Sequence, residues 1–283
     1  MSSLEVDLRS LFAICAIGLA GCEGSWLYPV PWPDGSELEL LQSTTHLHVW
    51  AEPKRIRNGT WEPFMEGAES HVTSVLELLD VDEIDKVDVY LHGQCYDPAG
   101  PKDCVRLKGQ TAGPTLVDLW FSGVFRSNVS LQHSMFRHEL AHAVTGQVYG
   151  GCPRYLLEEG LAEYARLGGV EPVQPYDVPG TTIDDLAEAL ASRGGDWIPL
   201  DDLVNTADFV RFLEEGTEGL LYAEAGALAE HLIQLEDLPT YIALQDRTCV
   251  SNAATFHAVF EELYGAELRD IDRALRNAVD AWQ

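Results

Sequence analysis

The chain has 283 residues, of which 46 % are hydrophobic and 23 % are charged, a balance typical of a globular body and not of a disordered or polytopic membrane protein. It carries 46 Asp and Glu residues against 18 Lys and Arg residues, so its formal net charge is −28. An acidic surface repels phosphate backbones and anionic headgroups, which argues against nucleic acid as a partner. The charge names no substrate, since a solvated, self-repelling surface explains it more simply than a trap for cationic ligands.

The N-terminal segment predicts export. Residues 11–20 form an uncharged apolar run after Arg9, too short to span a bilayer and typical of a signal-peptide core. The run ends in Leu-Ala-Gly-Cys at residues 19–22, which resembles the lipobox of bacterial lipoproteins. This resemblance implies cleavage before Cys22, which would become the lipid-modified mature N-terminus. It also implies a lipid-anchored protein of the bacterial cell envelope, with the outer membrane favoured over the inner one because Glu23 follows the cysteine.

The cysteines beyond this segment are consistent with export. They are Cys95, Cys104, Cys152 and Cys249. An even number in an envelope protein predicts two disulfides, for which three pairings exist. Cys95 and Cys104 bracket a stretch with Pro and Gly that lets the chain double back, so we expect them to pair, which leaves Cys152 for Cys249. A structural zinc site built from the four is the weaker alternative, since no Cys-x-x-Cys spacing occurs.

Composition and periodicity divide the chain into four parts. They are a signal peptide at 1–21, a proline-containing tether at 22–40, an α/β sheet part at 41–122 and a helical part at 123–283. In the sheet part, alternation predicts strands at 44–51, 86–92 and 115–121, and apolar residues at helical spacing predict a helix at 64–79. We therefore expect an α+β fold in which a small mixed sheet precedes a mainly helical region.

The helical part shows apolar periodicity that Gly, Pro or Ser/Thr interrupts at each junction. The predicted helices cover 131–149 with Ser130 as N-cap, about 153–167, 183–192, 207–214, 221–235, 252–264 and 268–282. In the first predicted strand, His46 and His48 share one face, a spacing that could hold a metal. A polar strand face is the simpler explanation of that pair.

One motif in the 131–149 helix carries chemistry, namely His138-Glu139-Leu140-Ala141-His142. Residues four apart share a helix face, so both imidazoles can bind one cation at about 2 Å from each nitrogen. Glu139 lies one step round the helix, beside a metal-bound water whose proton it can accept as that water attacks a carbonyl. Packing alone is a poor explanation, because two buried histidines and a glutamate would need other polar partners.

A second motif, Leu-Glu-Glu-Gly-Leu-Ala-Glu-Tyr at residues 157–164, follows on the next predicted helix. Antiparallel return of that helix would give the cation an anionic third ligand and leave a fourth position open. Together the motifs resemble the gluzincin peptidases, in which a Leu-x-Glu-Gly-x-Ala-Glu-Tyr helix follows the His-Glu-x-x-His helix. The resemblance implies a zincin-like fold, one zinc ion per chain, Glu159 as third ligand, and Glu163 hydrogen-bonded to a histidine. Glu158 points about 100° away on the helix, so only one of the pair can bind the metal.

The resemblance extends to the segment at 220–229, LLYAEAGALA. Related aminopeptidases carry at this helix start a tyrosine that polarises the scissile carbonyl, and Tyr222 is the matching residue, although a core tyrosine is the alternative. The Gly-x-Met-x-Asn strand that binds a free amino terminus in those enzymes is missing, so aminopeptidase activity is not implied. In this group, a strand before the metal helix pairs with an extended substrate, and residues 115–121 are the candidate.

These observations predict a zinc-dependent, endopeptidase-like hydrolase that cleaves peptide or protein substrates. Glu139 would be the general base, Tyr222 a carbonyl-polarising donor, and His138, His142 and Glu159 the zinc ligands. The rival hypothesis is a non-catalytic envelope binding or scaffold lipoprotein that keeps the fold without turnover. Scaffolds of this type usually lose the general base, so the presence of Glu139 favours the enzyme. No sequence feature names the substrate.

Overall fold

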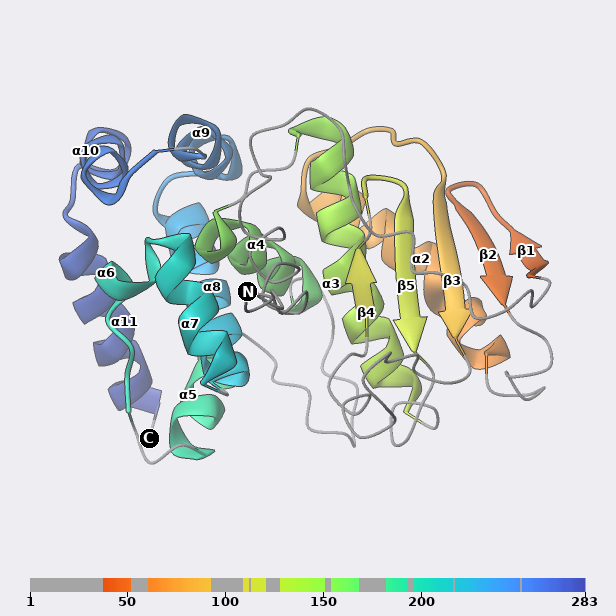
Figure 1. Ribbon diagram of the computed structural model, residues 1–283, viewed down its shortest axis with the longest axis horizontal. Helices are drawn as coiled ribbons and strands as arrows, with labels where there is room; N and C mark the ends of the chain where they lie inside the picture. Colours follow the sequence, from red (N-terminus) through yellow and green to blue (C-terminus); the bar gives the residue numbers. More distant parts are fainter. Residues whose placement is uncertain are drawn as a thin grey trace, which may run out of the picture.

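The fold combines a mixed sheet with a larger set of helices, so the expected α+β class is confirmed (Figure 1). The computed structural model describes residues 38–51, 61–92, 109–111, 113–120, 128–150, 154–167, 182–192, 196–215, 217–249 and 251–282. The predicted signal peptide and Cys22, Cys95, Cys104 and Cys152 lie outside these residues, while Cys249 is the C-cap residue of a helix. The predictions of the lipid anchor and of both disulfides therefore stay predictions.

Five strands form one sheet in the order β1-β2-β3-β5-β4. They are β1 (Glu39–Ser43), β2 (Leu47–Ala51), β3 (Val87–His92), β4 (Gly109–Thr111) and β5 (Leu116–Trp120). The central strands β2, β3 and β5 are parallel, and β1 and β4 pair antiparallel at the two edges. The sequence predicted neither edge strand, and β1 begins within the supposed tether. Because β1 is largely exposed and β4 has only three residues, neither shows the alternation that marks a half-buried strand.

One face of the sheet is apolar and is covered by two helices, α2 (Glu62–Leu78) and α3 (Val129–Val148) (Figure 1). Alternate positions of the three central strands are fully or almost fully buried; they are Leu47, Val49, Ala51, Val87, Val89, Leu91, Val117 and Leu119. Burial of each of these larger side chains contributes on the order of 2 kcal/mol. This alternation in the sequence correctly predicted the three central strands.

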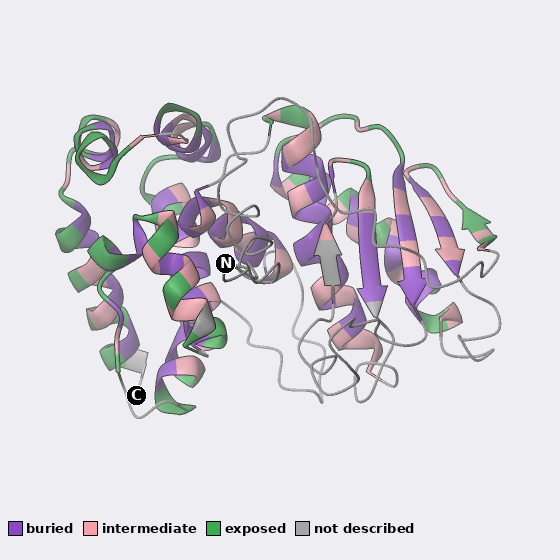
Figure 2. Cartoon of the chain, in the orientation of Figure 1, coloured by how far each residue is buried: buried purple, intermediate pink, exposed green. Residues whose placement is uncertain are grey.

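Helix α3 is the structural centre of the molecule, because the sheet and α2 flank it on one side and the remaining helices on the other (Figure 1). Its middle turns are buried almost all round, whereas exposed residues gather at β1 and on the outer helices (Figure 2). The N-cap is Asn128, whose side chain accepts a hydrogen bond from the Leu131 backbone N–H, and not Ser130 as expected. Both residue types cap helices well, so the sequence alone could not distinguish them.

The remaining helices form the second half of the structure. They are α4 (Tyr155–Leu167), α5 (Thr182–Ser192), α6 (Leu200–Leu203), α7 (Thr206–Glu214), α8 (Glu218–Leu235), α9 (Leu238–Thr248), α10 (Ala253–Tyr264) and α11 (Leu268–Trp282). Only α6 and α9 were not predicted; α6 is a single turn, and α9 follows α8 after a very short break. Across the described ranges, no helix has both the length and the apolar character needed to cross a membrane.

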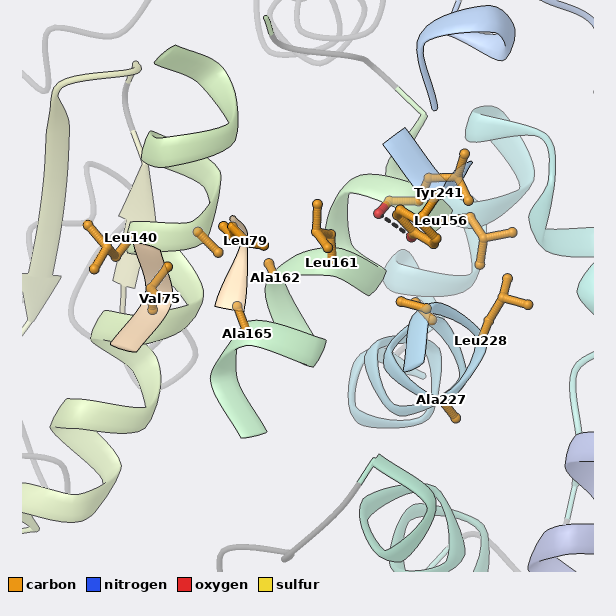
Figure 3. Close-up of a cluster of buried hydrophobic side chains, with 14 of the residues drawn as sticks. Val75, Leu79, Leu140, Leu156, Leu161, Ala162, Ala165, Ala227, Leu228 and Tyr241 are labelled. Carbon is orange, nitrogen blue, oxygen red and sulfur yellow. Dashed lines mark hydrogen bonds between the residues drawn. The ribbon is translucent and has the colours of Figure 1, made fainter. Parts of the chain in front are cut away.

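Helix α4 packs between α3 and α8, and two glycines allow its close approach to α8. A Cβ atom at Gly160 would lie 2.6 Å from the carbonyl oxygen of Ala225, and one at Gly226 would lie 2.7 Å from Cβ of Glu163. The hydroxyl of Tyr241 donates a hydrogen bond of 2.7 Å to the Leu157 carbonyl, which ties α9 to the same helix (Figure 3). These contacts fix the height of α4 relative to α3 and α8.

Candidate metal centre

Two histidines of α3 and a glutamate of α4 converge on one point. The Nε2 atoms of His138 and His142 lie 3.2 Å apart, and Oε2 of Glu159 lies 3.3 Å from each of them. His138 and His142 are four residues apart and therefore share one face of α3, while Glu159 is in the second turn of α4. Among the described residues, these three form the single group of at least three His, Cys, Asp or Glu side chains that could hold a metal ion.

The dimensions of this triangle fit a tetrahedral metal ion. Ligand atoms placed about 2.0 Å from a zinc ion at the corners of a tetrahedron are separated by about 3.3 Å. The three observed separations are 3.2 to 3.3 Å. In addition, Oε2 of Glu159 is buried without a well-oriented hydrogen bond from any described residue. A buried carboxylate oxygen of this kind is stabilised when a cation lies between it and the two imidazoles.

The electrostatics of the cluster also favour a cation. Burial by itself would lower the pKa of His138, but the carboxylates of Glu159 and Glu163 raise that pKa well above its usual value. Burial likewise opposes the charged form of Glu159, yet His142 and His138 hold the pKa of Glu159 well below its usual range. The pocket therefore keeps its carboxylate ionised and attracts positive charge to the imidazole nitrogens. A metal ion would supply that charge in place of the protons.

The other two glutamates of α4 contact the histidines from outside the triangle. Oε1 of Glu163 lies 2.8 Å from Nδ1 of His138, so Nδ1 can carry the proton and leave Nε2 as the metal-binding atom. Oε1 of Glu158 lies 3.8 Å from Nδ1 of His142, and burial raises the pKa of Glu158 to about 7. Glu158 is therefore outside the group that could hold the metal, in agreement with the angle expected from helix geometry.

Glu139 is buried beside the metal group but is not one of its members. Burial raises the pKa of Glu139, and the neighbouring His138 and His142 partly offset that effect. Its carboxylate oxygen Oε2 lies 2.9 Å from the hydroxyl of Thr111, which is also 2.7 Å from the Glu139 backbone carbonyl. A carboxylate held in this position can accept a proton from a molecule bound at the metal.

Tyr222 of α8 lies near His138, with the two ring centroids 6.0 Å apart. Burial, and then the charges of Glu159 and Glu218, raise the pKa of Tyr222, so its hydroxyl keeps its proton. A protonated phenol can donate a hydrogen bond to an oxygen atom that gains negative charge. The matching residue of the sequence resemblance is therefore close to the metal group.

The structure does not bring His46 and His48 to any metal group. Nδ1 of His46 lies 2.7 Å from Glu69, and Nδ1 of His48 lies 3.4 Å from Asp88. Each imidazole faces one carboxylate, so the simpler explanation of a polar strand face agrees with the observed contacts.

The prediction that residues 115–121 pair with a substrate is wrong. They contain β5, whose two edges are already occupied by β3 and β4. The edge strand beside α3 is β4, which in the described sheet has β5 as its only neighbour. The error arose because β4 is too short to show alternation, so β5 was taken for the edge strand of the sheet.

The sequence also did not predict any role for Thr111, which lies at the end of β4 and contacts the carboxylate of Glu139. No local pattern marks this threonine, since its partner is 28 residues further along the chain. No known protein-family profile matches the chain, and no curated protein sequence shows significant similarity to it. The functional inferences therefore depend on the motifs and on the geometry of the site.

Proposed function

We propose that this protein is a zinc-dependent peptidase with a zincin-like, gluzincin-type site. The observation that carries the proposal is the triangle of His138, His142 and Glu159, whose edges of 3.2 to 3.3 Å suit tetrahedral zinc. Three protein ligands leave a fourth position, as a catalytic zinc site requires and a closed structural site does not. The buried carboxylate of Glu139, adjacent to this triangle and outside it, adds the base that hydrolysis needs.

In peptide hydrolysis, water adds to the scissile carbonyl carbon, the C–N bond breaks, and the nitrogen leaves as an amine. Bound zinc would act as a Lewis acid that polarises the carbonyl and lowers the pKa of the attacking water. Glu139 accepts the proton of that water and returns it to the leaving nitrogen, so that protons balance. The second proton of the water stays on the new carboxyl group and is then released to solvent, so the remaining product is the carboxylate of the newly formed C-terminus.

Two further side chains support this chemistry. Tyr222 donates a hydrogen bond to the carbonyl oxygen as that oxygen gains negative charge, which lowers the barrier because the donor is already in position. Thr111 shares its single hydroxyl proton between Oε2 and the backbone carbonyl of Glu139, which favours one orientation of the carboxylate throughout turnover. Since Thr111 contacts the base and not the substrate, we regard it as a positioning residue.

The substrate in this proposal is an extended peptide that adds to the sheet edge at β4. Backbone hydrogen bonds to an edge strand hold peptides of many sequences, which suits an endopeptidase-like enzyme. Thr111 belongs to that strand and also contacts Glu139, so a peptide paired with β4 would lie next to the base. The Leu-Ala-Gly-Cys segment at 19–22 further suggests an enzyme anchored in a bacterial envelope through lipid on Cys22.

A peptide-library digest with the purified full-length protein tests the proposal. We expect one zinc ion per chain by metal analysis, cleavage of a subset of peptides, loss of cleavage after removal of zinc by a chelator, and recovery when zinc is added back. Protein that holds zinc but cleaves nothing across a broad library would contradict the peptidase and favour the scaffold lipoprotein. Protein that binds no zinc would contradict the metal site itself.

A further inference from the structure

A chain of buried charges continues beyond Glu163 to another helix. Oε2 of Glu163 lies 2.5 Å from Nε of Arg166, which is one turn later on the same face of α4. The opposite end of the Arg166 guanidinium donates to Asp185 of α5 over 2.8 Å, and its third nitrogen approaches the hydroxyl of Ser134 at 3.4 Å. The contacts therefore connect α5 to the metal ligand His138 through two intermediate side chains.

This chain of contacts is largely shielded from water. The side chains of Glu163, Arg166 and Asp185 are 6 %, 15 % and 22 % exposed, so solvent can replace little of what each partner provides. Both oxygens of Glu163 are engaged, one by His138 and the other by Arg166. Removal of Arg166 would leave Glu163 with a buried charge held at one end only.

We propose that Arg166 and Asp185 are positioning residues for the metal, which act through Glu163 to hold the His138 ring with Nε2 directed at Glu159. The inference rests on the proposed zinc site, but it concerns zinc affinity and not peptide cleavage. A metal ligand binds most tightly when its ring is already oriented, because the cost of ordering it has been met during folding. Arg166 fixes the carboxylate that orients His138, and Asp185 fixes Arg166.

The test is a double-mutant cycle on the zinc dissociation constant of the full-length protein, measured by competition with a chromophoric chelator. We expect Glu163→Gln to weaken zinc binding by about 10- to 100-fold, the usual effect of losing a partner of a metal-bound histidine. Arg166→Met should weaken it by about tenfold. Asp185→Asn should have an effect between those of wild type and Arg166→Met.

The decisive outcome is non-additivity. If Arg166 acts through Glu163, then Arg166→Met should weaken zinc binding by no more than about twofold in the Glu163→Gln background. If Arg166 affected zinc binding independently of Glu163, the loss would be the same in both backgrounds, and that result would overturn the proposal. Arg166→Lys keeps a cation near Glu163 and should recover part of the affinity lost in Arg166→Met.

Arg211 provides a matched control on α7. Like Arg166 it contacts two carboxylates, Asp208 of its own helix and Glu215 at the C-cap, but it is 50 % exposed and belongs to a different helix from the metal ligands. Arg211→Met should leave the zinc dissociation constant unchanged. Thermal unfolding of each metal-free variant checks folding, and if Arg166→Met does not fold, Arg166→Lys and Asp185→Asn are each combined with Glu163→Gln in the same cycle.

The outcomes also separate this inference from the proposed function. Wild-type protein that binds no zinc would contradict both the positioning role of Arg166 and Asp185 and the proposed zinc peptidase. Wild type that binds zinc with an affinity unchanged by Arg166→Met and by Asp185→Asn would remove only the positioning role. Wild type that binds zinc and cleaves no peptide would remove only the peptidase.

Discussion

Histidines lie close to carboxylates both on the sheet and between α3 and α4, but the two regions arrange them differently. On the sheet, Nδ1 of His46 lies 2.7 Å from Glu69, and Nε2 of His92 lies 2.7 Å from Asp118. Between α3 and α4, two imidazole nitrogens and one carboxylate oxygen converge in a triangle. Both regions contain buried groups, so burial alone does not distinguish them.

The difference is in the number of acceptor atoms that share one space. In a one-to-one pair, a single proton between nitrogen and oxygen satisfies both atoms. In the triangle, two imidazole nitrogens and one carboxylate oxygen face one another, and Oε2 of Glu159 has no well-oriented donor among the described residues. A cation at the centre satisfies all three at once. An imidazole close to a carboxylate is therefore weak evidence for a metal, whereas convergence at tetrahedral separations is strong evidence.

The largest expected effect separates the two regions directly. His142→Ala removes one corner of the triangle and should weaken zinc binding by more than about 100-fold, beyond the range for residues that only contact a ligand. His46→Gln on the sheet should leave zinc binding unchanged. Metal analysis and chelator competition on both variants provide the measurement. Equal zinc in His142→Ala and wild type would contradict the assignment of the metal site.

The second prediction concerns Glu139, which lies beside the triangle without being part of it. Glu139→Gln should keep zinc and fold normally, while kcat on a cleaved peptide should fall by at least about 100-fold, since a positioned proton acceptor is lost. The loss should appear in kcat more than in KM, because the base acts on charge that develops in the transition state. Loss of zinc from this variant would mean that Glu139 is itself a ligand.

The third prediction concerns Tyr222, the hydroxyl donor near His138, and Tyr222→Phe tests it. We expect kcat to fall by about tenfold to a few hundredfold, less than for Glu139→Gln, because zinc still polarises the carbonyl when one donor is removed. Tyr149→Phe is the control, since the hydroxyl of Tyr149 donates to the Leu79 carbonyl, outside the metal group. Equal kcat values for Tyr222→Phe and wild type would leave Tyr222 as a packing residue only.

The smallest expected effect belongs to Thr111. Thr111→Val removes a hydrogen bond worth about 1 kcal/mol, so kcat should fall about fivefold while zinc affinity and KM stay close to wild type. Thr111→Ser keeps the hydroxyl and should restore kcat. The control is Thr145→Val, because the Thr145 hydroxyl bonds to the Ala141 carbonyl within α3. If Thr111→Ser and Thr111→Val lose activity equally, the hydroxyl has no positioning role.

Local periodicity predicted much of the fold. A periodic pattern can be read from neighbouring residues alone, without knowledge of the tertiary structure. The alternation in Leu47–Ala51 and Val87–His92 predicted central strands, and apolar spacing predicted α2, α3 and most later helices. The missed elements were β1, β4 and the single turn α6, which show no clear pattern, and α9, which follows α8 after a very short break. Packing against the rest of the molecule stabilises such short elements. A short stretch of sequence does not show which tertiary contacts its residues will make.

The candidate site shows the same division. The spacing of His138 and His142 on a helix requires both imidazoles to share a face, because helix geometry is the same in every protein. The choice of Glu159 came from the resemblance of the Glu-Gly motif of α4 to the gluzincin pattern. The tertiary structure alone determined that β4 and not β5 is the sheet edge, that Thr111 contacts Glu139, and that Arg166 connects to Asp185. These contacts join residues 28 and 19 positions apart. Their formation depends on how the helices and strands pack together, which no spacing within one segment specifies.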